Sequence, residues 1–273
     1  MRLSSAEVAS FRAVIFDHYR REGRSFPWRE THDPYRILVS ELMLQQTQTE
    51  RVAAKYGPFL ERFPNFDSLA TAGLAEVFGL WKGLGYNRRA KALRDTALRV
   101  VDEHAGKLPA EPSLLETFPG IGPYTARAIC AFAFDMPVVF IETNIRRVFI
   151  QHFFAEESDL HDRRLLPLVE ATLDREDPRR WYYALMDYGA ALRRQVPNPN
   201  TRSSHYVRQA PFENSNRQIR GRILDLLSEG ARLSEVDIAA RAGFPAERVR
   251  RSLIALQEDG LLVCEESVYR IPN

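Results

Sequence analysis

Helical periodicity constrains the fold of this chain more than any other feature. From residue 5 to residue 190, apolar residues mostly recur at spacings of three and four, and short Pro/Gly turns divide the pattern into segments such as NRRAKALRDTALRVVDEHA and YTARAICAFAF. Hairpin signals do not interrupt these segments. The pattern predicts a mainly helical fold, in which SELMLQQTQTERVAAKYGPFLERF and SLATAGLAEVFGLW each read as a helix.

The N-terminal segment is predicted to be an amphipathic helix and not a targeting signal. Its apolar face would carry Val8, Phe11, Val14, Ile15 and Tyr19. The segment lacks a secretory hydrophobic region and cleavage site, and the sequence contains no apolar run of about 18 residues that would span a membrane. With 45% apolar and 27% charged residues, the composition is that of a soluble globular protein. We expect a cytoplasmic monomer that does not bind membranes.

The two cysteines, Cys130 and Cys264, limit the metal chemistry that is open to the chain. Both lie in apolar sequence contexts, so we expect inert core thiols. Two cysteines cannot form a four-cysteine metal or cluster site. The sequence therefore predicts no metal ligands.

A change in composition at residues 193–218 predicts a domain boundary. This stretch is rich in Pro, Asn, Ser and Arg, and the region from residue 193 to residue 222 holds seven arginines, one acid (Glu213) and no lysine. Arginine suits phosphate recognition, although a solvated basic linker explains the charge equally well. We predict a catalytic domain at 1–192, a linker or DNA-contacting arm at 193–218 and a third unit at 219–273. Arg202, Arg208 and Arg217 are the candidate DNA contacts of this region.

The last unit has a winged-helix pattern. RQIRGRILDLLSEG reads as a helix ended by Gly230, LSEVDIAARAG as a helix capped by Ser234, and PAERVRRSLIALQEDG as a third helix. LLVCEESVYRIP reads as two short strands around a turn. In such modules the third helix commonly enters a DNA groove, and Arg248 and Arg251 are the candidate contacts. Many winged helices bind only protein, so this alternative stays open.

The segment LLETFPGIGPYTARAI predicts a turn that holds phosphate. Gly120 and Gly122 flank one isoleucine and lead directly into a helix. Glycine lets backbone N–H groups approach an anion closely, and the helix adds the positive end of its dipole. Thr125 and a second apolar helix complete a helix-hairpin-helix pattern. Such a turn positions the DNA backbone without reading bases.

These motifs together resemble the helix-hairpin-helix DNA glycosylases, and most of all the mismatch adenine glycosylases (MutY-like). The resemblance covers about residues 26–192. It is carried by FPWR, DPYRILVSELMLQQTQTERV, LWKGLGYNRRAKAL, FPGIGPYTARAI and ETNIRRVF. It implies two helical subdomains, a monofunctional glycosylase of base excision repair and association with the bacterial nucleoid. Its partner would be double-stranded DNA that contains a damaged or mismatched base, which is flipped into a pocket between the subdomains.

The resemblance assigns roles to several positions. It makes Glu41 the acid that protonates the adenine leaving group, and it makes Gln46 and Tyr86 the residues that wedge into the duplex. Gln45 shares the amide-rich string and can meet base edges. Tyr86 could instead be a core aromatic residue, and the glutamines could be plain helix surface.

Two further matches concern the chemistry at the sugar. Tyr124 occupies the position of the lysine in bifunctional glycosylase-lyases, so a Schiff base is not expected there and strand cleavage should be weak. Asn144 matches a supporting asparagine near the sugar. Thr143 stands where the family often has glycine.

Glu142 falls where the family keeps an aspartate that faces the sugar. A fixed carboxylate there would stabilise the positive charge that develops on deoxyribose as the glycosidic bond breaks. We expect Glu142 to stay ionised at a helix N-terminus, while Glu41 is protonated. The extra methylene of glutamate would displace the carboxylate. The alternative is a charge at a helix start that is paired with Arg146 or Arg147.

Two features of the family are missing. The segment after MDYGA has no cysteine, so we expect no iron–sulfur cluster and, as a cofactor, at most a monovalent cation at the helix-hairpin-helix turn. The usual C-terminal domain, which reads oxidised guanine opposite the adenine, is replaced by the winged-helix pattern. We therefore keep open a glycosylase for another base, a non-catalytic DNA-damage sensor, and a transcription regulator built on the winged helix.

Overall fold

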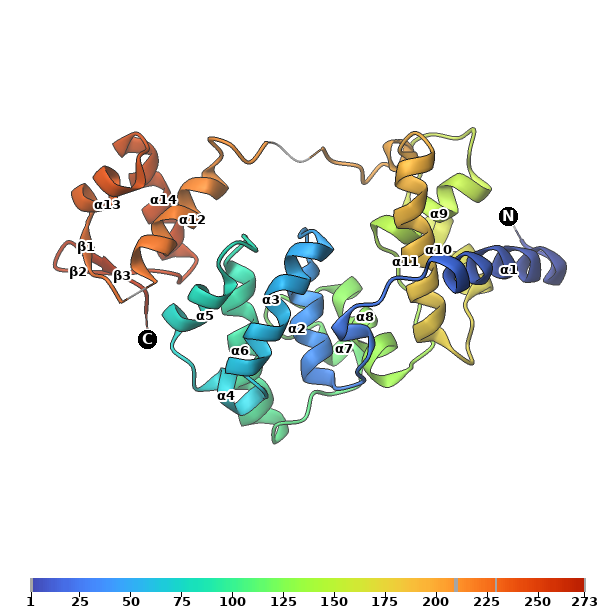
Figure 1. The fold of residues 1–273 in the computed structure, drawn as a ribbon, viewed down its shortest axis with the longest axis horizontal. Coiled ribbons are helices and arrows are strands. Elements are labelled where there is room, and N and C mark those ends of the chain that lie inside the picture. Colours follow the sequence, from blue (N-terminus) through green and yellow to red (C-terminus); the bar gives the residue numbers. More distant parts are fainter. Residues whose placement is uncertain (1, 209–210, 229, 273) are drawn as a thin grey trace. The chain divides into compact units, whose positions relative to one another are not determined.

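The computed structural model describes residues 2–208, 211–228 and 230–272 (Figure 1). The chain is mainly helical and forms two compact units, each assembled from several segments. One unit comprises Met1–Pro34, Ala110–Ser113 and Gly122–Arg208, and the other comprises Tyr35–Pro109, Leu114–Ile121 and Gln209–Asn273. None of the described helices has the length and hydrophobicity needed to cross a membrane.

The first unit is built around the packing of two helices, α9 and α11. Its elements are α1 (Ser5–Glu22), η1 (Pro27–Arg29), α8 (Pro123–Phe134), α9 (Thr143–Phe153), α10 (Asp162–Thr172), α11 (Pro178–Gln195) and η2 (Pro199–Arg202). Gly189 of α11 allows the close approach, because a Cβ atom there would lie 2.4 Å from the carbonyl oxygen of Asn144. Trp181 and Phe149 fill the adjoining core and are fully buried.

The N-terminal helix forms as predicted, but its buried face differs in part. Ser4 and Glu7 close a capping box at its start, which satisfies backbone N–H groups that a helix end otherwise leaves open. Phe11 and Ile15 are buried as expected, whereas Val14 is 44% exposed. His18 is buried instead. The prediction missed His18 because it counted only apolar residues on the buried face.

The second unit contains shorter helices than the sequence pattern suggested. They are α2 (Pro34–Leu44), α3 (Thr49–Arg62), α4 (Phe66–Ala70), α5 (Leu74–Trp81) and α6 (Arg88–His104), with α7 (Pro112–Leu115) where the chain passes between the units. The single helix predicted for SELMLQQTQTERVAAKYGPFLERF is wrong, because α2 ends at Leu44 and α3 begins at Thr49. Likewise, SLATAGLAEVFGLW contains α4 and α5, separated by a turn.

The C-terminal residues of this unit form a winged helix. Its elements are α12 (Asn216–Leu227), β1 (Leu233–Ser234), α13 (Glu235–Ala242), α14 (Ala246–Glu258), β2 (Val263–Glu265) and β3 (Val268–Arg270). The sheet order is β1-β3-β2, and both pairs are antiparallel. Ser234 caps α13 as predicted. The two-residue strand β1 was not predicted, and α12 ends at Leu227, before Gly230.

The two cysteines have different surroundings. Cys130 is buried in α8, as predicted, and burial raises the pKa of its thiol to about 11. Cys264 is exposed on β2, so its assignment to the core was wrong. The apolar residues around it in sequence, such as Leu262, are buried, while the strand turns Cys264 outward.

Candidate active site and DNA-binding surfaces

Glu41, the predicted acid, is buried in the second unit. The helix that carries it, α2, is apolar around most of its circumference, and Tyr35 anchors its start by donating from its hydroxyl to the carbonyl oxygen of Phe63 at 2.6 Å. Glu41 is 6% exposed, and its neighbours Leu42 and Met43 are fully buried. The alternative of an exposed helix acid is therefore wrong. The role of Glu41 as the acid stays a prediction.

Glu142 lies in the first unit as the N-cap of α9. Its Oε1 accepts hydrogen bonds from the backbone N–H groups of Asn144 and Ile145 at 2.7 and 2.8 Å, and its Oε2 accepts from Nδ2 of Asn144 at 3.3 Å. The backbone of Glu142 is extended, as is usual for an N-cap. The longer side chain of glutamate can thus still form the helix cap that a shorter aspartate commonly provides. These bonds hold the carboxylate in one place.

The charge of Glu142 is under opposing influences. Burial is the largest and raises the pKa, while the hydrogen bonds from Asn144 and Ile145 and the charges of Arg147 and Arg146 lower it. The net effect is a pKa above the ordinary value for glutamate. This outcome runs against the expectation that the helix N-terminus alone would keep the group ionised, because the loss of hydration outweighs the helix contacts.

The arginines beside Glu142 have other hydrogen-bond partners. Arg146 makes two bonds to Asp162, at 2.7 and 2.6 Å. Arg147, which is 5% exposed, donates to Oδ1 of Asn144 at 2.6 Å and to the carbonyl oxygen of Gly189 at 2.7 Å. Arg147 therefore fixes the orientation of Asn144, the predicted supporting residue. From the sequence, Arg147 was considered only as a charge partner of Glu142, and Gly189 was not singled out. The contact of Arg147 with Asn144 and Gly189 depends on the packing of α9 against α11.

The predicted residues of α8 also lie in the first unit. Tyr124 has its ring 5.7 Å from that of Phe140 in an edge-on arrangement, and Thr125 is 3% exposed. Phe140 in turn stacks on Tyr182, whose hydroxyl donates to the carbonyl oxygen of Val138 at 2.7 Å. The aromatic contacts place Tyr124 at the edge of a packed cluster. A tyrosine side chain carries no amine.

The glycines of the helix-hairpin-helix turn differ in what they require. Gly120 has φ +73°, and a Cβ atom there would lie 2.8 Å from Cβ of Ala92, so the turn needs glycine for both conformation and space. Gly122 is the N-cap of α8, with φ −91°, and a Cβ atom there would meet no protein atom within 4 Å. Any need for glycine at Gly122 would therefore come from a partner that approaches the helix N-terminus.

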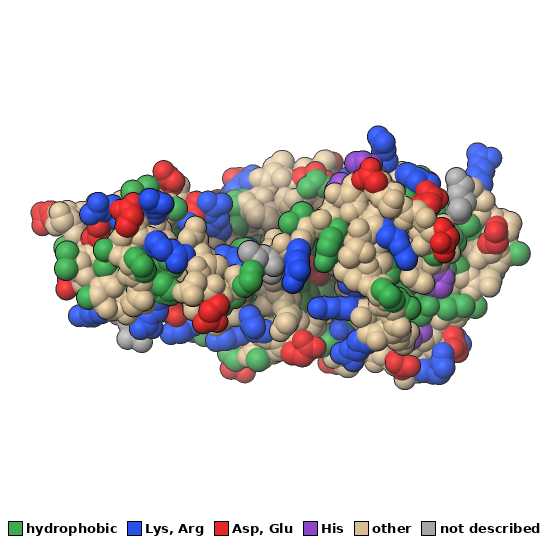
Figure 2. Space-filling model, turned by 90° about the horizontal axis from the view of Figure 1, so that it is seen from above, with side chains coloured by type: hydrophobic (Ala, Val, Ile, Leu, Met, Phe, Trp, Pro, Cys, Tyr) green, Lys and Arg blue, Asp and Glu red, His purple; other side chains and the backbone are tan. Residues whose placement is uncertain are grey.

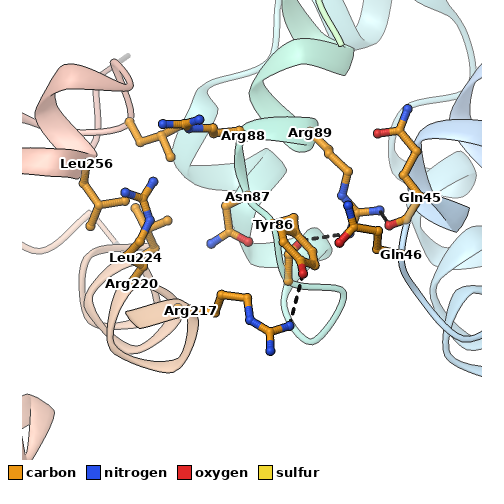
Figure 3. A pocket seen from close by; sticks show the side chains of 13 residues that line it. Gln45, Gln46, Tyr86, Asn87, Arg88, Arg89, Arg217, Arg220, Leu224 and Leu256 are labelled. Carbon is orange, nitrogen blue, oxygen red and sulfur yellow. Dashed lines mark hydrogen bonds between the residues drawn. The ribbon is translucent and has the colours of Figure 1, made fainter. Parts of the chain in front are cut away.

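The candidate wedge residues sit on two loops of the second unit (Figure 3). Gln46 lies in the turn between α2 and α3 with φ +55°, and Tyr86 lies just before α6 with φ +48°. Such backbone conformations are uncommon for residues other than glycine, and they often mark functional sites. Gln45 donates from Nε2 to the carbonyl oxygen of Gly120 at 3.2 Å, so its amide supports the turn.

One buried arginine, Arg89, holds both loops. Its Nη1 donates to the carbonyl oxygens of Leu42 and Met43 at 2.8 and 3.0 Å and also to that of Gln45. Its Nη2 donates to the carbonyl oxygens of Leu84 and Gly85 at 3.1 and 2.9 Å. Burial lowers the pKa of Arg89 to about 10, so it stays charged at neutral pH. By donating to carbonyl oxygens at the end of α2, Arg89 caps this helix, and α2 ends at Leu44.

Residues 198–203 of the predicted arm pack on the start of α9. Asn200 is 4% exposed and donates from Nδ2 to the carbonyl oxygen of Thr143 at 2.9 Å. Ser203 forms a parallel bridge with Leu160. Arg202 belongs to the short helix η2, and Arg208 is exposed. Residues 198–203 thus brace the helix that Glu142 caps, and the DNA contacts of this arm stay a prediction.

The arginines of α14 are paired within the winged helix. Arg250 and Arg251 bond to Glu235 and Glu247, at 2.8 and 2.9 Å. Arg248 donates to the carbonyl oxygen of Asn214 at 2.6 Å. Figure 2 shows basic and acidic side chains intermixed over the visible face. DNA contact by Arg248 and Arg251 stays a prediction. To contact DNA, the two arginines would have to break their present bonds to Asn214 and Glu247.

Asp187 braces the first unit from within. It is 3% exposed and accepts from the backbone N–H and Nε of Arg24 and from both terminal nitrogens of Arg29, each at 2.8 Å. Burial acts to raise the pKa of Asp187, but the hydrogen bonds and charges of the two arginines lower it overall. Asp187 thus ties α11 to the FPWR segment, in agreement with a bracing role.

The residues present do not fit an iron–sulfur cluster. The chain has two cysteines, and they belong to different units. Within the parts of the chain that the structure describes, no group of three or more His, Cys, Asp or Glu residues is placed to hold a metal ion.

Comparison with known proteins decides the family. Residues 39–171 match the model of the HhH-GPD superfamily base excision DNA repair proteins. The chain is 33% identical to the adenine DNA glycosylase of Mycolicibacterium smegmatis over 282 residues, which cover 96% of this chain and 93% of that protein. The chain belongs to the adenine DNA glycosylase family. It is a DNA glycosylase that acts in base excision repair.

Other relatives agree with this assignment. The adenine DNA glycosylase of Mycobacterium tuberculosis is 36% identical over 77% of this chain and 75% of its own length. Among solved structures, a thermostable thymine-DNA glycosylase matches with a TM-score of 0.61 and 27% identity over 67% of this chain and 86% of its own. A trapped endonuclease III–DNA intermediate, with 17% identity and a TM-score of 0.57 over 70% of this chain and 88% of its own, supports the fold alone. The predicted glycosylase fold is confirmed.

Proposed function

We propose that this glycosylase releases mispaired adenine from double-stranded DNA and leaves an abasic site. The names of the curated relatives support adenine as the base. The single observation that best supports the mechanism is the pair of acids in contrasting settings. Glu41 is buried on an apolar helix. Burial also acts on Glu142, but Glu142 accepts two backbone N–H bonds at a helix start and has arginine charges nearby.

The reaction follows from these two settings. Glu41 donates its proton to a ring nitrogen of the flipped base, which makes the base a better leaving group. The C1′–N bond breaks, its electron pair leaves with the base, and positive charge develops on the sugar. Glu142 acts in its ionised form, which the bonds from Asn144 and Ile145 and the nearby arginine charges favour against the effect of burial. Its carboxylate stabilises the charge on the sugar, with Asn144 oriented by Arg147 beside it. Water adds to C1′ and its extra proton passes to solvent.

The same geometry supports a monofunctional enzyme. A lyase step needs an amine that attacks C1′ and forms a Schiff base. Tyr124 occupies the position where a lysine would supply this amine, and its ring packs against Phe140. We propose that strand cleavage requires alkali or a second enzyme, and that the reaction proceeds without an iron–sulfur cluster.

DNA binding is proposed to use several contacts of the two units. The N-terminus of α8, at Gly122 and Thr125, would hold a backbone phosphate. Gln46 and Tyr86 would enter the duplex and fill the space of the flipped base. The arm, with Arg202 and Arg208, would add phosphate contacts without base reading. A monovalent cation at the helix-hairpin-helix turn is part of this proposal.

A second candidate substrate is a mispaired thymine. The observation that favours it is the similarity to the thymine-DNA glycosylase structure, which exceeds 25% identity. The buried acid and the helix-cap carboxylate suit either base, because the charge on the sugar is the same in both reactions. The two substrates differ in the edge that the base presents to the pocket.

Single-turnover base release distinguishes these substrates. Duplexes carry A, T, U, hypoxanthine or an alkylated purine opposite G, C or 8-oxoguanine, and each reaction is divided into samples with and without alkali. We expect release of adenine from mispairs, with strand breaks only in the alkali-treated samples. Release of thymine alone would make mispaired thymine the substrate in place of adenine. Strand breaks without alkali would contradict the monofunctional assignment. Tight binding with no release from any duplex would make the protein a damage sensor.

A further inference from the structure

The winged helix belongs to the same compact unit as the wedge loops and makes charged contacts with them. Asp259, at the end of α14, is paired with Arg88 at the start of α6 and with Arg220 of α12. The side chain of Asp259 is 8% exposed. Burial acts to raise the pKa of Asp259, but the bonds from Arg88 and Arg220 lower it overall. Asp225 of α12 adds a second pair, 3.6 Å from Lys82.

These contacts bring one arginine of α12 onto Tyr86 (Figure 3). Nη1 of Arg217 donates to the hydroxyl of Tyr86 at 3.1 Å, and its guanidinium carbon lies 5.6 Å from the centre of the tyrosine ring. The guanidinium of Arg89 lies 5.5 Å from the same ring. Two cations therefore contact one aromatic ring, an arrangement that favours a fixed ring position.

The loops and α12 enclose a pocket of about 360 Å³. Gln46, Tyr86 and Asn87 line it from the loops, and Arg217 and Arg220 line it from α12. Arg89 fixes the backbone of both loops, but it does so through carbonyl oxygens and leaves the tip of the Tyr86 side chain to other contacts. Arg217 supplies a contact at this tip.

We propose that Arg217 is a positioning residue for Tyr86, and that the winged helix, docked through Asp259, completes the duplex-opening site. This inference rests on the proposed wedge role of Tyr86. The winged helix then contributes to base extrusion through α12. Its α14 helix carries arginines that are paired with Glu235 and Glu247 and is not the main contact.

A double-mutant cycle tests the contact in the full-length protein. The variants are Arg217→Ala, Tyr86→Phe and the double variant. Extrusion is followed by the fluorescence of 2-aminopurine placed next to a mispaired adenine, and base release is measured under single turnover. Each single change should slow extrusion about three- to tenfold, the range expected for loss of one ordinary hydrogen bond. The double variant should be no slower than the slower single variant.

Arg222→Ala is the matched control, because Arg222 lies on the same helix and donates to the carbonyl oxygen of Arg241 inside the winged helix, at 3.4 Å. It should leave extrusion unchanged. Losses that add in the double variant, or a defect of Arg217→Ala that low salt restores, would show a phosphate contact and overturn the proposal. An equal loss in Arg222→Ala would show general damage to the winged helix and overturn it as well.

Asp259→Asn tests the docking separately. It should reproduce the slow extrusion of Arg217→Ala while circular dichroism shows an intact fold. Normal extrusion by Asp259→Asn would contradict the proposal that docking through Asp259 is needed. The wild type alone reports on the proposed function, because absence of adenine release contradicts that function whatever the variants do. Extrusion is read without bond cleavage, so the role of Arg217 is still decided in that case.

Discussion

Replacing Glu142 by glutamine separates catalysis from helix capping. In the wild type, Oε1 of Glu142 accepts from the N–H groups of Asn144 and Ile145 at 2.7 and 2.8 Å. Glutamine has the same length and keeps one carbonyl oxygen, which can accept both bonds. The substitution removes the charge and the weaker bond, 3.3 Å long, that Oε2 accepts from Nδ2 of Asn144. A purely structural Glu142 should tolerate it, while a carboxylate that stabilises the sugar cation should not.

The effect on stability follows from the direction of the pKa shift. The folded protein raises the pKa of Glu142, so folding disfavours its ionised form. The resulting loss of unfolding free energy is therefore absent below the unfolded pKa of Glu142. It grows as the pH rises from the unfolded pKa to the folded pKa, and it is full above the folded pKa. Glu142→Gln should unfold with at least the wild-type free energy at neutral pH. Glu142→Ala loses the cap and should cost about 0.5–2 kcal/mol.

The effect on catalysis should be much larger. Removing one fixed electrostatic contact to a charged transition state typically lowers the rate by about 10²–10³-fold. We expect this loss in single-turnover adenine release by Glu142→Gln. Glu142→Asp keeps the charge and the capacity to cap, so it should retain most of the activity.

The matched control is Asp177→Asn, the same loss of charge at the N-cap of α11. Asp177 accepts from the backbone N–H of Arg180 at 3.1 Å in the same unit. Base release by this control should match the wild type. If Glu142→Gln also released adenine at the wild-type rate, Glu142 would be a helix cap and the catalytic argument would be refuted.

Four further outcomes are expected. Arg89→Met should lower the free energy of unfolding by about 3 kcal/mol, measured in urea, because several carbonyl groups lose a charged donor; a change below about 0.5 kcal/mol would contradict the role of Arg89 in holding the loops. Gly120→Ala should destabilise by about 1–3 kcal/mol and weaken DNA binding, whereas Gly122→Ala should fold normally; equal stability of the two would be inconsistent with the turn described. Base release should fall on acidification as Glu142 is protonated, with a midpoint above the usual glutamate range, and a rate that is flat over that range would oppose its catalytic role. Arg208→Ala should weaken duplex binding and reduce its salt dependence in fluorescence anisotropy, and an unchanged slope would exclude a phosphate contact.

Regular helices could be predicted from the sequence, because their signals are local. The periodicity of residues 88–104 and the cap at Ser234 depend on a few neighbouring residues, and both form as expected. The break after Leu44 was not predictable in this way. It depends on Arg89, which is distant in sequence and takes up carbonyl oxygens at the end of α2.

The candidate site shows the same division. The identity of its residues follows from the motifs, but their supports come from tertiary contacts. Arg147 reaches Asn144 because Gly189 lets α11 approach α9, and no local pattern signals that contact. The sequence also gave no sign that burial would dominate the pKa of Glu142, because burial is a property of the folded unit.

The most direct test of the central claim compares wild type with Glu41→Gln on a duplex that contains adenine opposite guanine or 8-oxoguanine. Adenine release is measured under single turnover with enzyme in excess, and binding is measured on the same duplex. Glu50→Gln, an acid in the first turn of α3, serves as the control. The account predicts that Glu41→Gln binds like the wild type and releases no measurable adenine, while Glu50→Gln remains active. Adenine release at the wild-type rate by Glu41→Gln would contradict the claim.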